Sequence, residues 1–358
     1  MDTYITALCN EIEAYATKYP KATIDSIYIG GGTPSILSNE QLSIIFDALK
    51  KNFNLSDEWF SNHEVSIECN PTSVDSAKLK HWKQLGINRV SMGVQSLCDQ
   101  TLKTLGRCHT SQDAKMAILE VSRYFDNISI DLIYGVPLTL EQVATDYYRA
   151  VEEELIDLMV GFADEIKHVS AYALTVEPGT QIHTKLIAGE LIDLDEEEFF
   201  EQEDNIQIAM RAWGLKRYEV SNFAKPGYEC KHNQRYWDPR KEYLGLGLAA
   251  HGLVDKVRYE NTPDLDMYLL NPNKIAKSDK QKDQDLADEM IMLGLRTPKG
   301  IDLPALMKLG IDFRIKKARE IFELESAKLI RVNKKNIRAT QEGMCVLNSV
   351  TSRLLLGS

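Results

Sequence analysis

The sequence predicts an α/β protein built on a largely parallel sheet, either doubly wound or closed into a barrel. Short apolar runs rich in β-branched residues alternate with amphipathic helical stretches, in units of roughly thirty residues. Four successive runs end in polar or glycine residues. Because ligands of such folds bind at the carboxyl ends of parallel strands, this pattern indicates a binding site there.

The predicted elements follow one another without long interruptions. An amphipathic helix over residues 1–19 precedes the first predicted strand, residues 24–29. A capping-box pattern over residues 38–41 begins the next helix. The remaining strands are predicted at 63–68, 88–93, 128–133 and 168–176, and the remaining helices at 73–85, 97–105, 111–125, 140–160 and 195–213.

The chain divides into three predicted regions. Residues 1–215 carry the alternating strands and helices, residues 216–264 form a connecting segment of strands and loops, and residues 265–358 form a mostly helical domain. Within the connecting segment, residues 218–223 have the composition of a strand.

The C-terminal region carries a predicted hairpin. Residues 329–332 and 336–338 have strand-like composition, and they flank Asn333-Lys334-Lys335. Helices on both sides of such a hairpin are typical of a winged-helix-like domain. The lysine-rich stretch 271–282 is predicted to be an exposed connection.

Composition limits the function. The chain has 358 residues, of which 44% are hydrophobic, and its formal net charge of -11 argues against broad nucleic-acid binding. No apolar run has the length of a membrane span, and the N-terminus lacks a signal-peptide pattern, so a cytoplasmic location is expected. The cysteines are scattered without C-x-x-C spacing, so they predict neither disulfides nor a local metal site: Cys9, Cys69, Cys98, Cys108, Cys230 and Cys345.

A glycine run marks the first predicted strand end. Gly30, Gly31 and Gly32 have no Cβ, so the backbone can adopt positive φ and lie directly against a ligand. Thr33 precedes Pro34, which favours an extended conformation for Thr33. A plain strand-to-helix turn is the alternative interpretation.

Polar side chains follow the other strands. Glu68 and Asp131 are carboxylates that could accept from a hydroxyl or an ammonium group. Gln95 suits a neutral polar group, and the Arg107 guanidinium suits a carboxylate. The alternatives are an exposed acid for Glu68, a buried ion pair for Asp131 and a surface arginine for Arg107, and Gln95 considered alone is better explained by a structural role.

These residues belong to motifs whose order resembles one family closely. The sequence is similar to the HemW family of the radical-SAM superfamily, haem chaperones described as oxygen-independent coproporphyrinogen III oxidase-like. The resemblance extends from Tyr4 to about Leu355 and implies a partial (β/α) radical-SAM TIM-like barrel with a smaller winged-helix-like C-terminal domain. The motifs are Gly30-Gly31-Gly32-Thr33-Pro34-Ser35, Glu68-Cys69-Asn70-Pro71, Gly93-Val94-Gln95-Ser96, Gly106-Arg107-x-His109, Asp131-Leu132-Ile133-Tyr134-Gly135-x-Pro137 and His232-Asn233-x-x-Tyr236-Trp237.

The resemblance implies binding of S-adenosylmethionine (SAM) and of haem. It implies that His232, beside Tyr236 and Trp237, contacts haem, although this segment is also consistent with a packed corner. The implied partners are haem-acceptor proteins, with peripheral contact to membrane-bound acceptors, and no nucleic acid. The residues implied to line the SAM site are Gly31, Gly32 and Thr33 along the methionine part, Arg107 at the carboxylate, and Glu68, Gln95 and Asp131 around the rest.

The sequence departs from the family in one motif. The family binds a [4Fe–4S] cluster through C-x-x-x-C-x-x-C, and this sequence has no such motif. We therefore expect that the first barrel strand is missing, through the gene model or a natural deletion, and that the chain is inactive in radical chemistry, with no catalytic or metal-binding residue to assign. Residues 24–29 would then form an exposed edge strand. An oxygen-independent coproporphyrinogen III oxidase and a non-catalytic binding remnant stay alternatives.

Overall fold

The computed structural model describes residues 1–144 and 150–357. Within them the chain forms two compact units, and the α/β architecture is as predicted. Unit 1 comprises residues 1–25, 40–59 and 230–358, and unit 2 comprises residues 26–39 and 60–229. The predicted domain boundaries after residues 215 and 264 stay a prediction.

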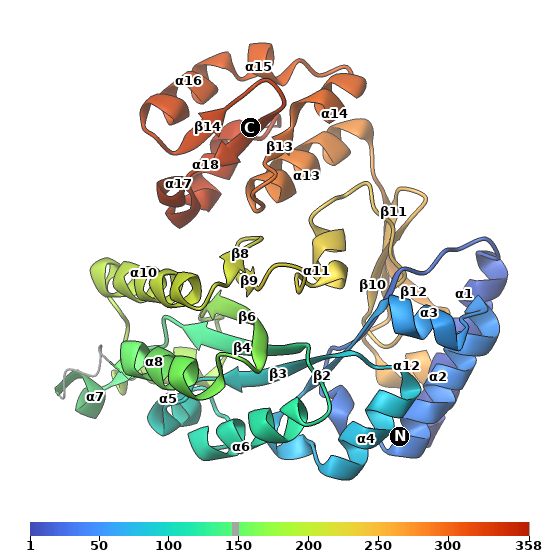
Figure 1. Cartoon of the computed structure of the whole chain (residues 1–358). Helices are drawn as coiled ribbons and strands as arrows, with labels where there is room; N and C mark the ends of the chain where they lie inside the picture. The colour runs from blue at the N-terminus through green and yellow to red at the C-terminus, as the bar shows by residue number, and fades with distance from the viewer. Residues whose placement is uncertain (145–149, 358) are drawn as a thin grey trace. The chain divides into compact units, whose positions relative to one another are not determined.

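Unit 2 is organised around one sheet with strand order β1-β2-β3-β4-β6-β9-β8 (Figure 1). Strands β1 to β4 and β6 run parallel, and β9 pairs antiparallel with both β6 and β8. The single strand predicted over residues 218–223 is wrong in part, because residues 222 and 223 begin β9 but residues 218–221 form the turn between β8 and β9. The strands are β1 (Ser26–Ile29), β2 (Glu64–Cys69), β3 (Arg89–Gln95), β4 (Ile128–Tyr134), β6 (Ile166–Ala173), β8 (Lys216–Arg217) and β9 (Asn222–Ala224).

Helices connect the parallel strands, and Figure 1 shows α4, α5, α6 and α8 along one side of the sheet. The helix predicted over residues 140–160 is α7 and α8, and its residues 145–149 lie outside the described part. The bounds in unit 2 are η1 (Pro34–Ile36), η2 (Pro71–Ser73), α4 (Ser76–Leu85), α5 (Asp99–Thr104), α6 (Ser111–Ser122), β5 (Leu138–Thr139), α7 (Leu140–Ala144), α8 (Ala150–Phe162), α9 (Gln181–Ile187), β7 (Leu191–Ile192) and α10 (Glu196–Ala212).

The sheet of unit 2 has two chemically different faces, because alternate residues of a strand point to opposite sides. One face is apolar and fully buried, with Val65, Val90 and Ile130 among its residues. The register places polar residues side by side on the other face, which we call the polar face: Tyr28, Ser66, Glu68, Arg89, Ser91, Ser129, Asp131, His168, Ser170, Tyr172 and Asn222. The candidate site lies on this polar face.

Unit 1 contains an antiparallel sheet, β10-β11-β12, and a second one, β13-β15-β14. The hairpin predicted around Asn333 is confirmed as β14 and β15. The exposed connection predicted over residues 271–282 is wrong in part, because residues 275–280 form the exposed strand β12. The bounds are α1 (Asp2–Lys18), α2 (Asn39–Phe53), α3 (Asp57–Asn62, shared with unit 2), α11 (Lys231–Tyr236), β10 (His251–Val254), β11 (Val257–Asn261), α12 (Leu265–Leu270), β12 (Ile275–Lys280), α13 (Asp283–Leu295), β13 (Ile301–Asp302), α14 (Leu303–Lys308), α15 (Phe313–Lys316), α16 (Ala318–Ser326), β14 (Ile330–Val332), β15 (Asn336–Ala339), α17 (Gln341–Cys345) and α18 (Leu347–Leu354).

A buried carboxylate fixes helix α1 within unit 1. Glu11 is completely buried and accepts hydrogen bonds from the Gly247 N–H at 2.8 Å, Asn261 Nδ2 at 2.6 Å and the Tyr268 hydroxyl at 2.7 Å. Burial raises the pKa of Glu11, and these hydrogen bonds oppose that shift. The carboxylate therefore links α1, β11, α12 and the loop before β10.

None of the described helices combines the length and the apolar character needed to cross a bilayer.

Candidate functional site

The glycine run after β1 contacts Glu68 at the end of β2. Glu68 accepts a hydrogen bond from the Tyr28 hydroxyl at 2.8 Å and another from the Gly31 N–H at 3.0 Å. A Cβ on Gly30 would lie only 2.5 Å from the Tyr28 ring and 2.8 Å from Glu68 Oε1, so any other residue here would displace the hydrogen-bonded Tyr28 and Glu68 side chains. Gly31 has a φ of 107°, and both Gly31 and Gly32 are exposed with open space where a Cβ would be.

The loops that follow β1 and β2 are hydrogen-bonded to each other. Asn70 Nδ2 donates to Thr33 Oγ1 at 3.4 Å, and the Ser35 and Ser73 hydroxyls lie 2.6 Å apart. Lys78 Nζ donates to the carbonyl oxygens of Ser35 and Ser73. These contacts fix the glycine run relative to Glu68, and they use the side chain of Thr33 within the protein.

Asp131 lies on the polar face of β4. It accepts a hydrogen bond from Ser91 Oγ at 3.4 Å, and Ser170 is its register neighbour on β6. Burial raises the pKa of Asp131 to about 6, against the lowering effects of Ser170 and of the nearby Arg89 guanidinium, and Glu68 raises it further. The Glu68 carboxylate thus acts on the Asp131 carboxyl group across this face.

Gln95 ends β3 in an unusual backbone conformation. Its φ is 68°, which is uncommon for a residue other than glycine. A Cβ on Gly93 would lie 2.7 Å from Gln95 Nε2 and 3.5 Å from Asn70 Oδ1. The absent side chain of Gly93 therefore lets Gln95 fold back beside Asn70. Gln95 also lines a small pocket of about 50 Å³, together with Ser96, Leu132, Glu154 and Gln202.

Two residues of the predicted Gly106-Arg107-x-His109 motif lie in different environments. Arg107 is exposed, and the structure records no hydrogen bond or ion pair for its guanidinium within the described residues. The neighbouring His109 is buried, with Nε2 3.0 Å from the Val94 carbonyl oxygen, and so has a structural role.

His232 lies in unit 1, on the short helix α11. Its Nε2 is 2.8 Å from the Tyr236 hydroxyl, and the two rings meet edge to face with centroids 4.9 Å apart. Tyr236 is 42% exposed and also contacts the Tyr243 ring, at 4.7 Å. The result is a surface cluster of a histidine and aromatic rings.

Sequence reasoning missed most of the polar face. Arg89, Ser91, His168 and Ser170 are all at least 95% buried, and His168 is hydrogen-bonded to Ser129 and Tyr218. Burial lowers the pKa of His168 well below its ordinary value, and the Arg89 charge lowers it further, so the imidazole is neutral. The alternation of polar residues in His168-x-Ser170-x-Tyr172 could have predicted a polar face, because alternate residues of a strand point to the same side of the sheet.

The cysteines are free thiols in the described residues. Cys69 is buried at the end of β2, and burial raises the pKa of its thiol. Within the described ranges, no three Cys, His, Asp or Glu side chains form a group that could hold a metal ion.

Sequence comparison connects both units to known proteins. A model of the radical SAM superfamily matches residues 4–147, and a model of the HemN C-terminal domain matches residues 282–346. The chain is 31% identical to the "Heme chaperone HemW" of Lactococcus lactis subsp. lactis, over 99% of this chain and 90% of that protein. It is 33% identical to the protein of the same name from Mycobacterium tuberculosis, over 85% of this chain and 76% of that one.

Two further relatives extend the comparison. The chain is 30% identical to the mitochondrial "Radical S-adenosyl methionine domain-containing protein 1" of Bos taurus, over 93% of this chain and 76% of that protein. The fold resembles the solved structure of the Escherichia coli coproporphyrinogen III oxidase HemN, with a TM-score of 0.79 and 20% identity, over 100% of this chain and 83% of that one.

Proposed function

We propose that this chain, which belongs to the HemW family of the radical SAM superfamily, binds SAM and haem and delivers haem to acceptor proteins. The observation that carries the proposal is the similarity to a haem chaperone over nearly the full length of both chains. The geometry of unit 2 adds support for the SAM part.

The polar face fits SAM as a ligand. SAM carries an ammonium group, a sulfonium cation and ribose hydroxyls, and each suits a carboxylate oxygen. Glu68 and Asp131 supply such oxygens near the carboxyl ends of β2 and β4, and the exposed backbone of Gly31 and Gly32 leaves room for close approach. Gln95 adds an amide that can donate and accept, and the exposed Arg107 guanidinium suits the SAM carboxylate.

The described residues do not fit an iron–sulfur cluster. Superfamily membership implies SAM and a [4Fe–4S] cluster, and the cluster needs thiolates that converge on one point. The cysteines of this sequence lie on separate elements, and no metal-ligating group forms among the described residues. The proposed function therefore assigns no step to a cluster.

Calorimetric titration with SAM tests the first half of the proposal. Glu68→Gln and Asp131→Asn each remove one charged acceptor, so each is expected to weaken SAM binding about tenfold or more. Asp164→Asn is the matched control, because Asp164 is an exposed acid in the same unit. Equal affinity of all four proteins would refute this assignment of the SAM site.

Absorbance titration with haem tests the second half. His232→Ala is expected to weaken binding about 100-fold and to change the Soret band, while Tyr236→Phe, which removes the hydroxyl beside Nε2, should weaken it about tenfold. His251→Ala, an exposed histidine of the same unit, is the control. Unchanged haem spectra in the His232 variant would exclude it as the iron ligand.

A further inference from the structure

The hairpin of β14 and β15 in unit 1 carries a concentration of positive charge. The whole chain has 42 lysine and arginine residues against 53 aspartate and glutamate residues, yet residues 328–338 contain no acid. Ile330 and Ile337 are buried on one face of the two strands. Arg331 and Arg338 therefore lie on the opposite face. All five cationic residues of this segment are exposed, and we call them the basic hairpin: Lys328, Arg331, Lys334, Lys335 and Arg338.

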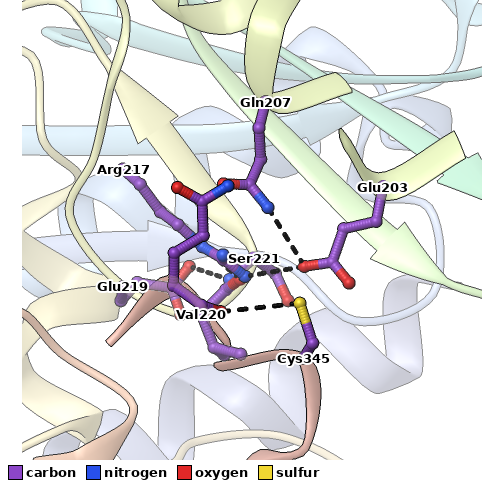
Figure 2. Close-up of polar contacts among 8 residues, drawn as sticks. Glu203, Gln207, Arg217, Glu219, Val220, Ser221 and Cys345 are labelled. Atoms are coloured by element: carbon purple, nitrogen blue, oxygen red, sulfur yellow. Dashed lines mark hydrogen bonds and ion pairs between the residues drawn. The ribbon is translucent and has the colours of Figure 1, made fainter. Parts of the chain in front are cut away.

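The positive charges of the basic hairpin lie beside one another rather than beside acids. The strand register places Arg331 directly opposite Arg338, and like charges in that position are destabilising. In the part of the chain that the structure describes, none of the five side chains has an ion pair or donates a hydrogen bond. By contrast, Figure 2 shows an arginine with partners, since Arg217 donates to the Val220 carbonyl oxygen at 3.0 Å and to Glu203. Contacts within the fold therefore do not explain the charges of the basic hairpin.

The tip of the hairpin is held by several hydrogen bonds. Asn333 Oδ1 accepts from the N–H groups of Lys335 at 2.8 Å and Asn336 at 3.0 Å. The Lys335 carbonyl oxygen accepts from the Leu303 N–H at 3.0 Å, and the Arg314 guanidinium donates to the Asn333 carbonyl oxygen. The basic hairpin is thus presented on a fixed backbone, so little backbone entropy is lost when a partner binds.

The size of the charged surface limits the kind of partner that fits it. At physiological ionic strength, charges separated by more than about 8 Å are largely screened, so the hairpin attracts only groups that reach it. An anionic bilayer or a nucleic-acid duplex extends beyond the hairpin and would also meet exposed acids of α16, such as Glu325, which accepts from the Val332 N–H at 3.2 Å. A cluster of carboxylates on a folded protein matches both the charge and the size of the hairpin.

We propose that the basic hairpin is a docking surface for an acidic face of a partner protein. Its arginines suit bidentate contacts with carboxylates, and its lysines add charge that increases the rate of encounter. The inference rests on the proposed function for one point only, that this partner is an acceptor of haem. Binding at this surface is reversible and weakens as the salt concentration rises.

Fluorescence anisotropy of the full chain with a defined acidic probe tests this surface. The probe is a fluorescein-labelled peptide of alternating glutamate and glycine, titrated at low and at physiological salt. The double variant Arg331→Glu with Lys334→Glu replaces two attractions by two repulsions and should weaken binding about tenfold or more. Lys335→Glu with Arg338→Glu should give a similar loss, and circular dichroism would show that both variants are folded.

The matched control reverses the same number of charges elsewhere in unit 1. Lys274→Glu with Lys280→Glu changes two exposed lysines at the edge strand β12, where lysine serves to protect an open strand edge, and should change the affinity by less than about twofold. Equal losses in the hairpin and β12 variants would overturn the inference, because binding would then follow net charge alone. A peptide that does not bind the native protein would also overturn it, as would tighter binding to phosphatidylserine vesicles or duplex DNA at the same salt concentration.

Haem titration of the native protein separates this inference from the proposed function. If haem does not bind, the proposed function is wrong, while the peptide titration still reports whether the basic hairpin binds an acidic partner. If haem binds and the peptide does not, the docking surface is wrong and the proposed function stands.

Discussion

Replacing Glu11 by alanine provides a quantitative test of how unit 1 is held together. The carboxylate is fully buried on α1 and accepts from the backbone of Gly247 and from the side chains of Asn261 and Tyr268. These donors come from segments more than 230 residues away in the sequence. The substitution therefore removes a contact between the first helix and the second half of the chain.

The expected loss follows from the donors left behind. Asn261 Nδ2 keeps a second acceptor, the Gly247 carbonyl oxygen at 2.9 Å, whereas the Gly247 N–H and the Tyr268 hydroxyl lose the acceptor recorded for them. A buried donor without an acceptor costs about 1–3 kcal/mol. We therefore expect Glu11→Ala to lower the free energy of unfolding by about 4 kcal/mol.

Urea denaturation followed by tryptophan fluorescence and by far-ultraviolet circular dichroism would measure this change. Glu13→Ala is the matched control, since Glu13 is an exposed acid on the same helix, and its substitution should change the stability by less than about 0.5 kcal/mol. A Glu11 variant as stable as the Glu13 variant would refute the reasoning. If Glu11→Ala does not fold, Glu11→Gln, which keeps one acceptor oxygen, should give an intermediate loss.

Three other substitutions in unit 2 have defined outcomes. The raised pKa of Asp131 means that its contribution to stability is fully present below about pH 4 and is lost as the pH rises through about 6. Between pH 4 and 7 the native protein should therefore lose about 2–3 kcal/mol of unfolding free energy relative to Asp131→Asn, as measured by denaturation. The same pH dependence in both proteins would contradict this. Gly86→Ala should lower the free energy of unfolding by at least about 2 kcal/mol, because φ is 94° and the new Cβ would lie 2.8 Å from Phe60. Gly179→Ala, with a φ of 86° and open space around the new Cβ, should lower it by only about 1 kcal/mol. Equal shifts in melting temperature would contradict a steric clash with Phe60. Asp75→Ala removes the acceptor for the Lys78 N–H at the start of α4 and should cost about 1 kcal/mol in the same assay, while an unchanged transition would exclude a capping role.

The sequence was sufficient for the parallel strands because each carries its own local pattern. Apolar runs such as residues 128–133 lie between turn residues and helical stretches, and no long-range information is needed to place them. The contact of the glycine run with Glu68 was also accessible, since parallel strands bring their carboxyl ends to one edge of the sheet.

The errors arose where local pattern carries no directional or long-range information. Residues 218–223 have strand composition whether they form one straight strand or, as observed, the turn after β8 and the start of β9. Strand β12 is exposed along its whole length, so it has no apolar alternation to reveal it.

The polar face of the sheet is better explained by ligand binding than by stability. Polar groups such as Ser129 and His168 are fully buried there, and burying them is favourable only when hydrogen bonds replace those to water. Apolar side chains of similar volume would stabilise the sheet equally well, as they do on the opposite face of the same strands. The face also keeps a carboxyl group with a raised pKa, Asp131, which further disfavours the fold at neutral pH. A positively charged ligand bound beside Asp131 would reverse that penalty, so the arrangement that weakens the empty protein is the one that favours the occupied state.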